Sequence, residues 1–219
     1  MPYRREFEQG SAAWLAWRRD GVGASDAPVV MGVSPWMALE ELRREKRGPP
    51  EDRPPNWAMR RGTRLEPEAR AFYVQRTGIH VTPLCLEHGT RRWMRASLDG
   101  ISDDGRVLLE VKCPGAVDHA RARSGRVPDK YVPQLQHLLE VSGAEVCHYW
   151  SYREGEGVLV EVAPEPEYIE GLVEREDGFW RLVLEDRRGV GADARLIRGI
   201  GTVVPVLPPP DVAESPEAV

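Results

Sequence analysis

The sequence lacks any run of the roughly 18 to 20 apolar residues that a transmembrane helix needs. Its first residues, from Met1 to Glu6, contain no apolar signal-peptide core, so we expect a cytoplasmic protein with no membrane partner. Cysteine is scarce, and the three cysteines at Cys85, Cys113 and Cys147 lie far apart. This spacing argues against a disulfide framework and against a four-cysteine metal site.

Lysine is scarce as well. Only three of the 30 basic residues are lysines (Lys46, Lys112 and Lys130), and the other 27 are arginines. The net charge of −5 combines a net +4 over residues 1–153, a net −8 over residues 154–187 and a net −1 over residues 188–219. Because phosphate contacts depend on local positive charge, the acidic average does not exclude a nucleic-acid partner.

The residues that are present predict one α/β domain with a mixed central sheet over residues 1–188. Helical patterns cover residues 11–19, 25–31, 37–47, 57–77, 116–124, 130–142 and 166–188. Patterns typical of β-strands cover residues 79–86, 93–101, 106–113, 145–153 and 156–163. The proline-rich residues 189–219 are predicted to form a flexible C-terminal tail.

The most informative segment is a predicted hairpin. Two strand-like runs flank Asp104-Gly105, a strong signal for a two-residue type I′ turn. That turn sets a register with the opposed pairs Asp103–Arg106, Ile101–Leu108, Asp99–Glu110 and Ser97–Lys112. Alternation along the strands then predicts one polar and one apolar face. The polar face holds Ser97, Asp99, Glu110 and Lys112, and the apolar face holds Ala96, Leu98, Leu109 and Val111.

Two carboxylates directly opposite each other weaken a sheet unless positive charge lies between them. A divalent cation such as Mg²⁺ suits this place, since it prefers carboxylate oxygens, water and substrate phosphate. Lys112 on the same face could position or activate a water or neutralise phosphate charge. The alternative is an exposed polar face that takes part in no reaction. Arginine is the usual basic residue of this chain, however, so a lysine at position 112 favours a specific role for that side chain.

Asp-x10-Glu-x-Lys on a hairpin resembles the PD-(D/E)XK nuclease motif, and its flanking residues are similar to those of the lambda-exonuclease and YqaJ-type viral recombinase family. The matching segments, in the family's order, are Gly23-Ala24-Ser25-Asp26, Gly32-Val33-Ser34-Pro35-Trp36, residues 61–68, Ser97-Leu98-Asp99-Gly100, Leu109-Glu110-Val111-Lys112-Cys113-Pro114 and residues 131–136. The resemblance spans about residues 11–152 and implies a restriction-endonuclease-like core, a central mixed sheet flanked by helices.

The family implies a DNA exonuclease that uses two Mg²⁺ ions, for which Mn²⁺ can substitute, and digests duplex ends 5′ to 3′. By this resemblance Asp99, Glu110 and the carbonyl of Val111 bind metal, Lys112 orients or activates the attacking water, and Glu66 adds an acidic active-site group. The remaining 3′ strand would pass to a single-strand-annealing recombinase. The family also implies a ring-shaped trimer in a bacterial or phage-infected cell.

The resemblance assigns further residues to the substrate. Arg18 and Ser25 match positions that hold the 5′ phosphate, with Arg19 as the alternative to Arg18, and Ser97 is placed with them. Gln134 and Gln136 match a glutamine-bearing helix beside the site. Residues two apart do not share a helix face, so we expect only one glutamine to face the site.

Two other functions remain open at this point. Another PD-(D/E)XK nuclease, specific for single strands or for a DNA structure, would share the metal site but lack the 5′-phosphate pocket. A non-catalytic DNA-binding or assembly protein on the same scaffold would need neither, and the intact Asp99, Glu110 and Lys112 argue against it.

Overall fold

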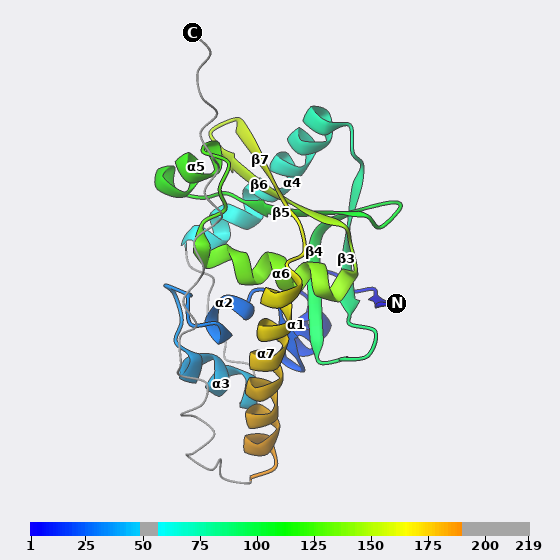
Figure 1. Cartoon of the computed structure of the whole chain (residues 1–219), viewed down its shortest axis with the longest axis vertical. Helices are drawn as coiled ribbons and strands as arrows, with labels where there is room; N and C mark the ends of the chain where they lie inside the picture. The colour runs from blue at the N-terminus through cyan, green and yellow to red at the C-terminus, as the bar shows by residue number, and fades with distance from the viewer. Residues whose placement is uncertain (49–56, 190–219) are drawn as a thin grey trace.

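The computed structural model describes residues 1–48 and 57–189 and contains one seven-stranded mixed sheet (Figure 1). The path β1-β3-β4-β5-β6-β7 forms the sheet, and β2 pairs with β4 off this path. The strands are β1 (Tyr3–Arg5), β2 (Val22–Gly23), β3 (Val81–Glu87), β4 (Met94–Ser102), β5 (Val107–Lys112), β6 (Val146–Arg153) and β7 (Glu156–Val162). Among these described strands, the β2–β4 and β5–β6 pairs are parallel and the other pairs are antiparallel.

Helices cover both faces of the sheet. The helices of the described residues are α1 (Ala12–Arg19), α2 (Ala27–Val30), α3 (Leu39–Arg47), α4 (Trp57–Thr77), α5 (Ala116–Arg123), α6 (Val132–Ser142) and α7 (Pro166–Arg187), with a short 3₁₀ turn (Asp129–Tyr131) before α6. This arrangement confirms the expected α/β class with a central mixed sheet. The predicted tail lies outside the described residues except for residue 189.

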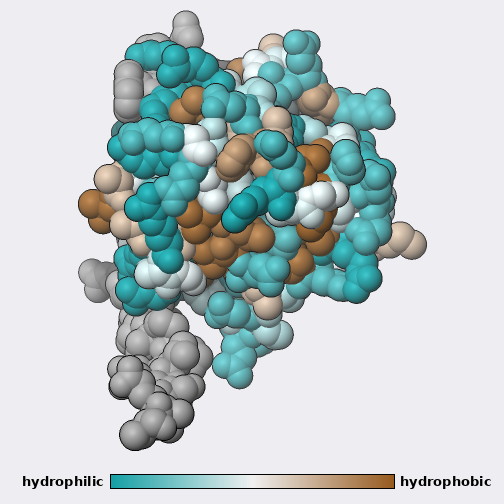
Figure 2. Space-filling view, turned by 90° about the horizontal axis from the view of Figure 1, so that it is seen from above, coloured by the Kyte–Doolittle hydropathy of each residue, from teal (hydrophilic) through white to brown (hydrophobic). Residues whose placement is uncertain are grey.

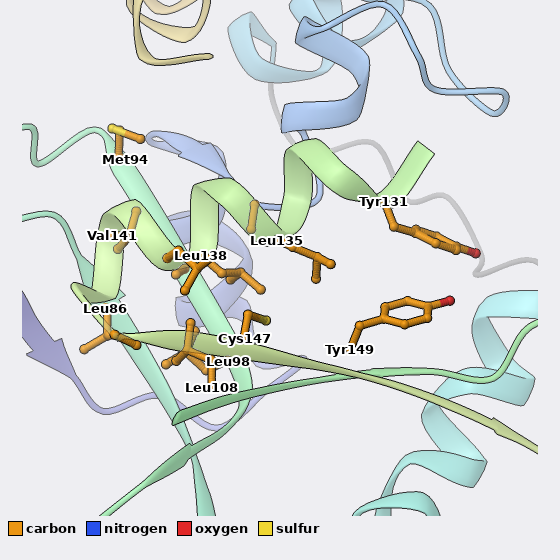
Figure 3. Packing of buried hydrophobic residues seen from close by; sticks show 14 of the residues in the cluster. Leu86, Met94, Leu98, Leu108, Tyr131, Leu135, Leu138, Val141, Cys147 and Tyr149 are labelled. Carbon is orange, nitrogen blue, oxygen red and sulfur yellow. The ribbon is translucent and has the colours of Figure 1, made fainter. Parts of the chain in front are cut away.

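Helix α6 lies across one face of the sheet and closes the largest apolar cluster (Figure 3). Leu135, Leu138 and Val141 of α6 point down onto Leu98 and Leu108 of the sheet. Gly143, at φ +71°, ends the helix in the left-handed conformation that glycine adopts without strain.

The other face is covered by α1 and α4. Ser11 caps α1 by accepting a hydrogen bond from the backbone N–H of Trp14, and Trp14 and Trp17 are both buried, as their spacing predicts. Helix α4 packs Ala69 and Tyr73 into a second apolar cluster against the sheet. A third cluster joins α2, α3 and α7.

Most predicted elements lie within two residues of their observed limits. Helix α4 begins and ends at the predicted residues, and Pro67 lies inside it without ending it. The short strands β1 and β2 were not predicted. Two or three residues are too few to show a period of two, so their pairing depends on the strands beside them.

The hairpin keeps the predicted register but not the predicted turn. Ile101 pairs with Leu108 as expected, while a β-turn closes earlier, with the N–H of Gly105 donating to the carbonyl of Ser102. Gly105 has φ +75°, but Asp104 has no positive φ, so the turn is not type I′. The Asp104 carboxylate instead accepts hydrogen bonds from Ser102 and from the backbone N–H of Arg106, which supports a longer loop.

A β-bulge in β4 changes which side chains share a face. The pairing of β4 with β3 shifts so that Asp99 and Gly100 lie opposite Pro83 alone. Proline has no N–H to donate, and strands accommodate it at bulges. Gly100 is required there because a Cβ would lie 2.8 Å from the side chain of Val81.

The bulge makes the predicted faces wrong. Leu98 packs with Leu108 on the α6 face, whereas Leu109 and Val111 pack against α4. Ser97 points to the α1 face, so it does not share the face of Glu110 and Lys112. One inserted residue reverses the alternation, and strict period-two reasoning cannot detect it.

Within residues 1–48 and 57–189, no helix combines the length and the apolar character needed to cross a membrane. Seen from the end of the molecule that is uppermost in Figure 1, the surface is largely hydrophilic around a central hydrophobic area (Figure 2).

Candidate active site

The candidate site lies where β4 and β5 separate. The two strands pair directly only at Gly100–Leu109 and Ile101–Leu108, although β5 continues beside β6 as far as Lys112. In the gap, the carboxylate of Asp99 accepts a hydrogen bond from the backbone N–H of Val111 at 2.8 Å. The bulge therefore turns the Asp99 side chain toward β5, next to the predicted metal-binding residues.

Glu110 is the centre of the polar contacts on the α6 side. Its side chain is only 3% exposed, and its Oε1 accepts hydrogen bonds from Lys112 Nζ and from Gln134 Nε2, both at 2.6 Å. Lys112 extends from the same strand, and Gln134 comes from the first turn of α6. The ammonium of Lys112 and the amide of Gln134 thus hold one carboxylate oxygen of Glu110 in place, and its other oxygen is left for a further partner.

The charges around Asp99 are not balanced. Burial, together with the carboxylates of Glu110 and Glu66, raises the pKa of Asp99 well above its ordinary value. Burial also raises the pKa of Glu66, although its ion pair with Arg70 at 3.0 Å opposes the rise. For Lys112, burial acts to lower the pKa, but Glu110 and Asp99 outweigh it and the pKa lies above the ordinary value.

These residues fit a divalent cation. In the part of the chain that the structure describes, no three His, Cys, Asp or Glu side chains form a complete metal-binding group by themselves. Mg²⁺ does not require one, because it is commonly held by one or two carboxylates with water and substrate phosphate. Asp99 and Glu110 supply hard oxygen donors, and a cation beside them would offset the repulsion that raises the pKa of Asp99.

A second group of predicted residues assembles on α1 and the turn before α2. Arg18 Nη2 donates to the hydroxyl of Ser25 at 2.6 Å, and its guanidinium lies 4.5 Å from the centre of the Trp14 ring. The indole N–H of Trp14 donates to the hydroxyl of Ser97 at 3.3 Å. Trp14 therefore contacts both Arg18 and Ser97. Ser97 lies on β4, two residues before Asp99.

The structure separates the alternatives at Arg18/Arg19 and Gln134/Gln136. Arg19 donates to the carbonyl of Gly48 rather than to Ser25. Gln136 is fully buried and bonds to Ala163 and Glu165 in the segment between β7 and α7. Of the two glutamines only Gln134 faces Glu110, as expected, because the position of Gln136 two residues later turns it to the other side of α6.

Two aromatic and basic neighbours of the site were not predicted. The ring of Tyr131, directly before α6, lies 5.3 Å from the ammonium of Lys112 and also 5.3 Å from that of Lys130. All three lysines of the chain are engaged, since Lys130 pairs with Asp118 and Lys46 pairs with Asp26. Each of the three lysines therefore makes a specific ion pair, so the scarcity of lysine does not single out Lys112.

The chain is similar to a known protein family and to solved structures. Residues 13–145 match the model of the YqaJ-like viral recombinase domain, and this segment contains both groups of residues described above. The uncharacterized protein YqaJ of Bacillus subtilis (strain 168) is 28% identical over 182 residues, which cover 80% of this chain. The match covers 57% of that protein, so the chain spans little more than half the length of this relative.

Solved structures of exonucleases share the fold. An alkaline exonuclease from Laribacter hongkongensis is 27% identical, with a TM-score of 0.70 over 82% of this chain and 96% of the exonuclease. The same exonuclease in complex with dAMP gives a TM-score of 0.71 with the same coverage. A phage-related exonuclease from Haemophilus somnus 129PT is 12% identical, covers 78% of this chain and 96% of its own, and has a TM-score of 0.59, which shows similarity of fold alone.

Proposed function

The chain belongs to the YqaJ-like viral recombinase domain family, and on this premise we propose that it is a Mg²⁺-dependent DNA exonuclease acting on linear duplex ends. It digests 5′ to 3′ and leaves 3′ single strands for recombination by annealing. The observation that carries the proposal is the meeting of Asp99 and Glu110 at the β4–β5 separation, with Lys112 and Gln134 donating to Glu110.

Each residue has a role in this proposal. Asp99, Glu110 and the carbonyl of Val111 hold the metal, and Mn²⁺ can replace Mg²⁺. When bound, a pair of such ions stabilises the attacking and leaving oxygens of phosphodiester hydrolysis. Lys112 supplies an ammonium donor that orients the attacking water, and Gln134 keeps Glu110 in position. Glu66, whose carboxylate interacts with that of Glu110, adds an acidic group from α4.

The end of the DNA is held by the other group. A guanidinium fork is suited to bidentate phosphate contact, and Arg18 presents one beside the exposed hydroxyl of Ser25. Ser97 joins this group through Trp14. Ser97 lies on β4 two residues before Asp99, so a 5′ phosphate held by this group would bind beside the strand that carries Asp99, which suits an enzyme that begins at ends.

The partners follow from the same proposal. The enzyme acts on double-stranded DNA ends in the cytoplasm and passes its product to a single-strand-annealing recombinase. A homotrimer around the DNA would keep the enzyme on one strand, and light scattering of the full chain tests it: a monomer would remove this part of the proposal.

A digestion assay tests the function itself. Linear duplexes with a 5′ phosphate, linear duplexes with a 5′ hydroxyl, and closed circles are incubated with Mg²⁺, with an EDTA control. We expect nucleotide release from linear DNA only, fastest from 5′-phosphorylated ends, and none with EDTA. Equal rates on all three substrates would indicate a different nuclease of the superfamily. No release, with Lys112→Ala indistinguishable from the wild type, would indicate a DNA-binding protein.

A further inference from the structure

Lys46 is a buried lysine that the proposed reaction does not use. It lies in the last turn of α3, a helix rich in charged residues, yet it is only 4% exposed. Lysine is almost never buried to this extent without a partner, because desolvation of an ammonium is costly. Its contacts therefore indicate what its burial achieves.

Lys46 joins two segments that are separate in the sequence. Its Nζ lies 2.5 Å from the Asp26 carboxylate and donates to the backbone carbonyl of Arg18 at 3.0 Å. The same Asp26 oxygen accepts a hydrogen bond from the N–H of Gly23 at 2.8 Å. One ammonium thus connects the end of α1 to the turn that leads into α2.

These two segments carry the phosphate-binding pair. Ser25 directly precedes Asp26, and the side chain of Arg18 leaves the Cα that is bonded to the carbonyl carbon held by Lys46. Ser25 is exposed, whereas its neighbours on both sides are buried. The Lys46–Asp26 pair thus fixes the backbone beneath both groups and sets the 2.6 Å approach of Arg18 to Ser25.

We propose that Lys46 is a positioning residue for the recognition of 5′-phosphorylated DNA ends. This inference rests on the proposed function and deepens it. Lys46 does not touch the phosphate, and Asp26 compensates its charge, so it acts through geometry rather than through its own field. It holds the guanidinium of Arg18 and the hydroxyl of Ser25 at the separation that one terminal phosphate bridges.

The test uses a variant that avoids an unpaired buried charge. Lys46→Met alone would leave Asp26 buried without its partner, which is strongly destabilising. The double variant Asp26→Asn/Lys46→Met removes both charges, and asparagine retains an acceptor for Gly23. The matched control is Arg43→Met/Asp186→Asn, because Arg43 lies on the same helix and forms a largely buried ion pair with Asp186 at 2.7 Å.

Two readouts are compared for each protein. Fluorescence anisotropy in EDTA measures binding to duplexes that differ only in a 5′ phosphate or a 5′ hydroxyl. Digestion with Mg²⁺ measures kcat and KM on the same two ends. In the Asp26→Asn/Lys46→Met variant we expect the preference for the phosphorylated end to fall about tenfold in binding and in KM. The kcat at hydroxyl ends should stay unchanged, and the control should retain the wild-type preference.

The outcomes separate the inference from the proposed function. A folded Asp26→Asn/Lys46→Met variant with the full preference for phosphorylated ends would overturn the inference, as would an equal loss in the Arg43→Met/Asp186→Asn control. If the wild type digests no DNA, the proposed function fails. Anisotropy still decides the inference in that case, because loss of end discrimination in the first variant supports it and unchanged discrimination overturns it.

Discussion

Glu87 and Asp99 are carboxylates on the neighbouring strands β3 and β4, and their surroundings are opposite. Glu87 receives hydrogen bonds from Arg5, Arg92 and the indole of Trp17, and these donors outweigh burial and lower its pKa to about 2. Asp99 receives one backbone hydrogen bond, and burial and two other carboxylates raise its pKa.

The difference distinguishes a structural carboxylate from a candidate functional one. Glu87 contributes to stability because its charge is fully compensated within the chain. Asp99 lacks such compensation and is suited to a cation or substrate that comes from outside. The partners of Glu87 therefore make it a structural carboxylate.

The largest expected effect is on catalysis at Asp99. Asp99→Asn removes a proposed metal ligand and should lower the digestion rate by about 10²–10⁴-fold, the range typical of a positioned catalytic group. It also removes like-charge repulsion, so thermal stability should stay equal or rise. Digestion assays and thermal unfolding followed by circular dichroism measure both. Asp103→Asn, the same substitution at an exposed position of the same hairpin, is the control and should change neither. Loss of the folded state in Asp99→Asn would show that the site is structural.

The next largest effect is expected at Glu87, where a substitution should lower stability and leave activity unchanged. Glu87→Gln leaves Arg5 and Arg92 without their carboxylate and should lower the free energy of unfolding by about 2 kcal/mol. A fully buried pair would lose more, but the two arginines are half exposed. Activity per folded molecule should be retained, and urea unfolding with digestion at low temperature checks both. Full stability in Glu87→Gln would contradict the comparison.

The same carboxylate predicts a pH dependence. Its pKa falls from 4.5 to about 2 on folding, so its stabilisation is complete above pH 4.5 and is lost as the pH falls through 4.5 toward 2. The stability difference between the wild type and Glu87→Gln should therefore shrink between pH 5 and pH 3, as urea unfolding at several pH values would show. A constant difference over this range would exclude the lowered pKa as the cause.

The smallest expected effects distinguish the roles of Gln134 and Gln136. Gln134→Ala removes one donor from Glu110 and should lower the digestion rate about tenfold, with little change in stability, in the range of 10–100-fold that supporting residues of metal ligands contribute. Gln136→Ala should instead cost about 1–2 kcal/mol of stability, because it removes a fully buried amide that bonds to the N–H of Glu165 and to the carbonyl of Ala163. Equal effects of the two variants on activity would contradict the assignment of Gln134 to the site.

Local patterns of the sequence were enough to predict the long elements. The limits of α4, the N-cap at Ser11 and the pairing of Ile101 with Leu108 depend on periodicity, capping and turn residues close in the chain. The place of Asp99 beside Glu110 was predicted from the hairpin register, and the family resemblance predicted that Arg18 and Ser25 act together.

Contacts between distant segments determine the features that local patterns did not predict. The bulge at Asp99–Gly100 depends on Pro83 of another strand, and it alone reverses the faces that alternation predicts. Packing of α6 on the sheet decides that Gln134 reaches Glu110, and the approach of α3 to α1 turns Lys46 into a link beneath Arg18. Short sequence motifs therefore identify the residues of the site, whereas contacts between distant segments determine how their side chains are oriented. Propensity and turn chemistry act over a few residues, and only the folded chain brings Pro83, Gln134 and Lys46 to their partners.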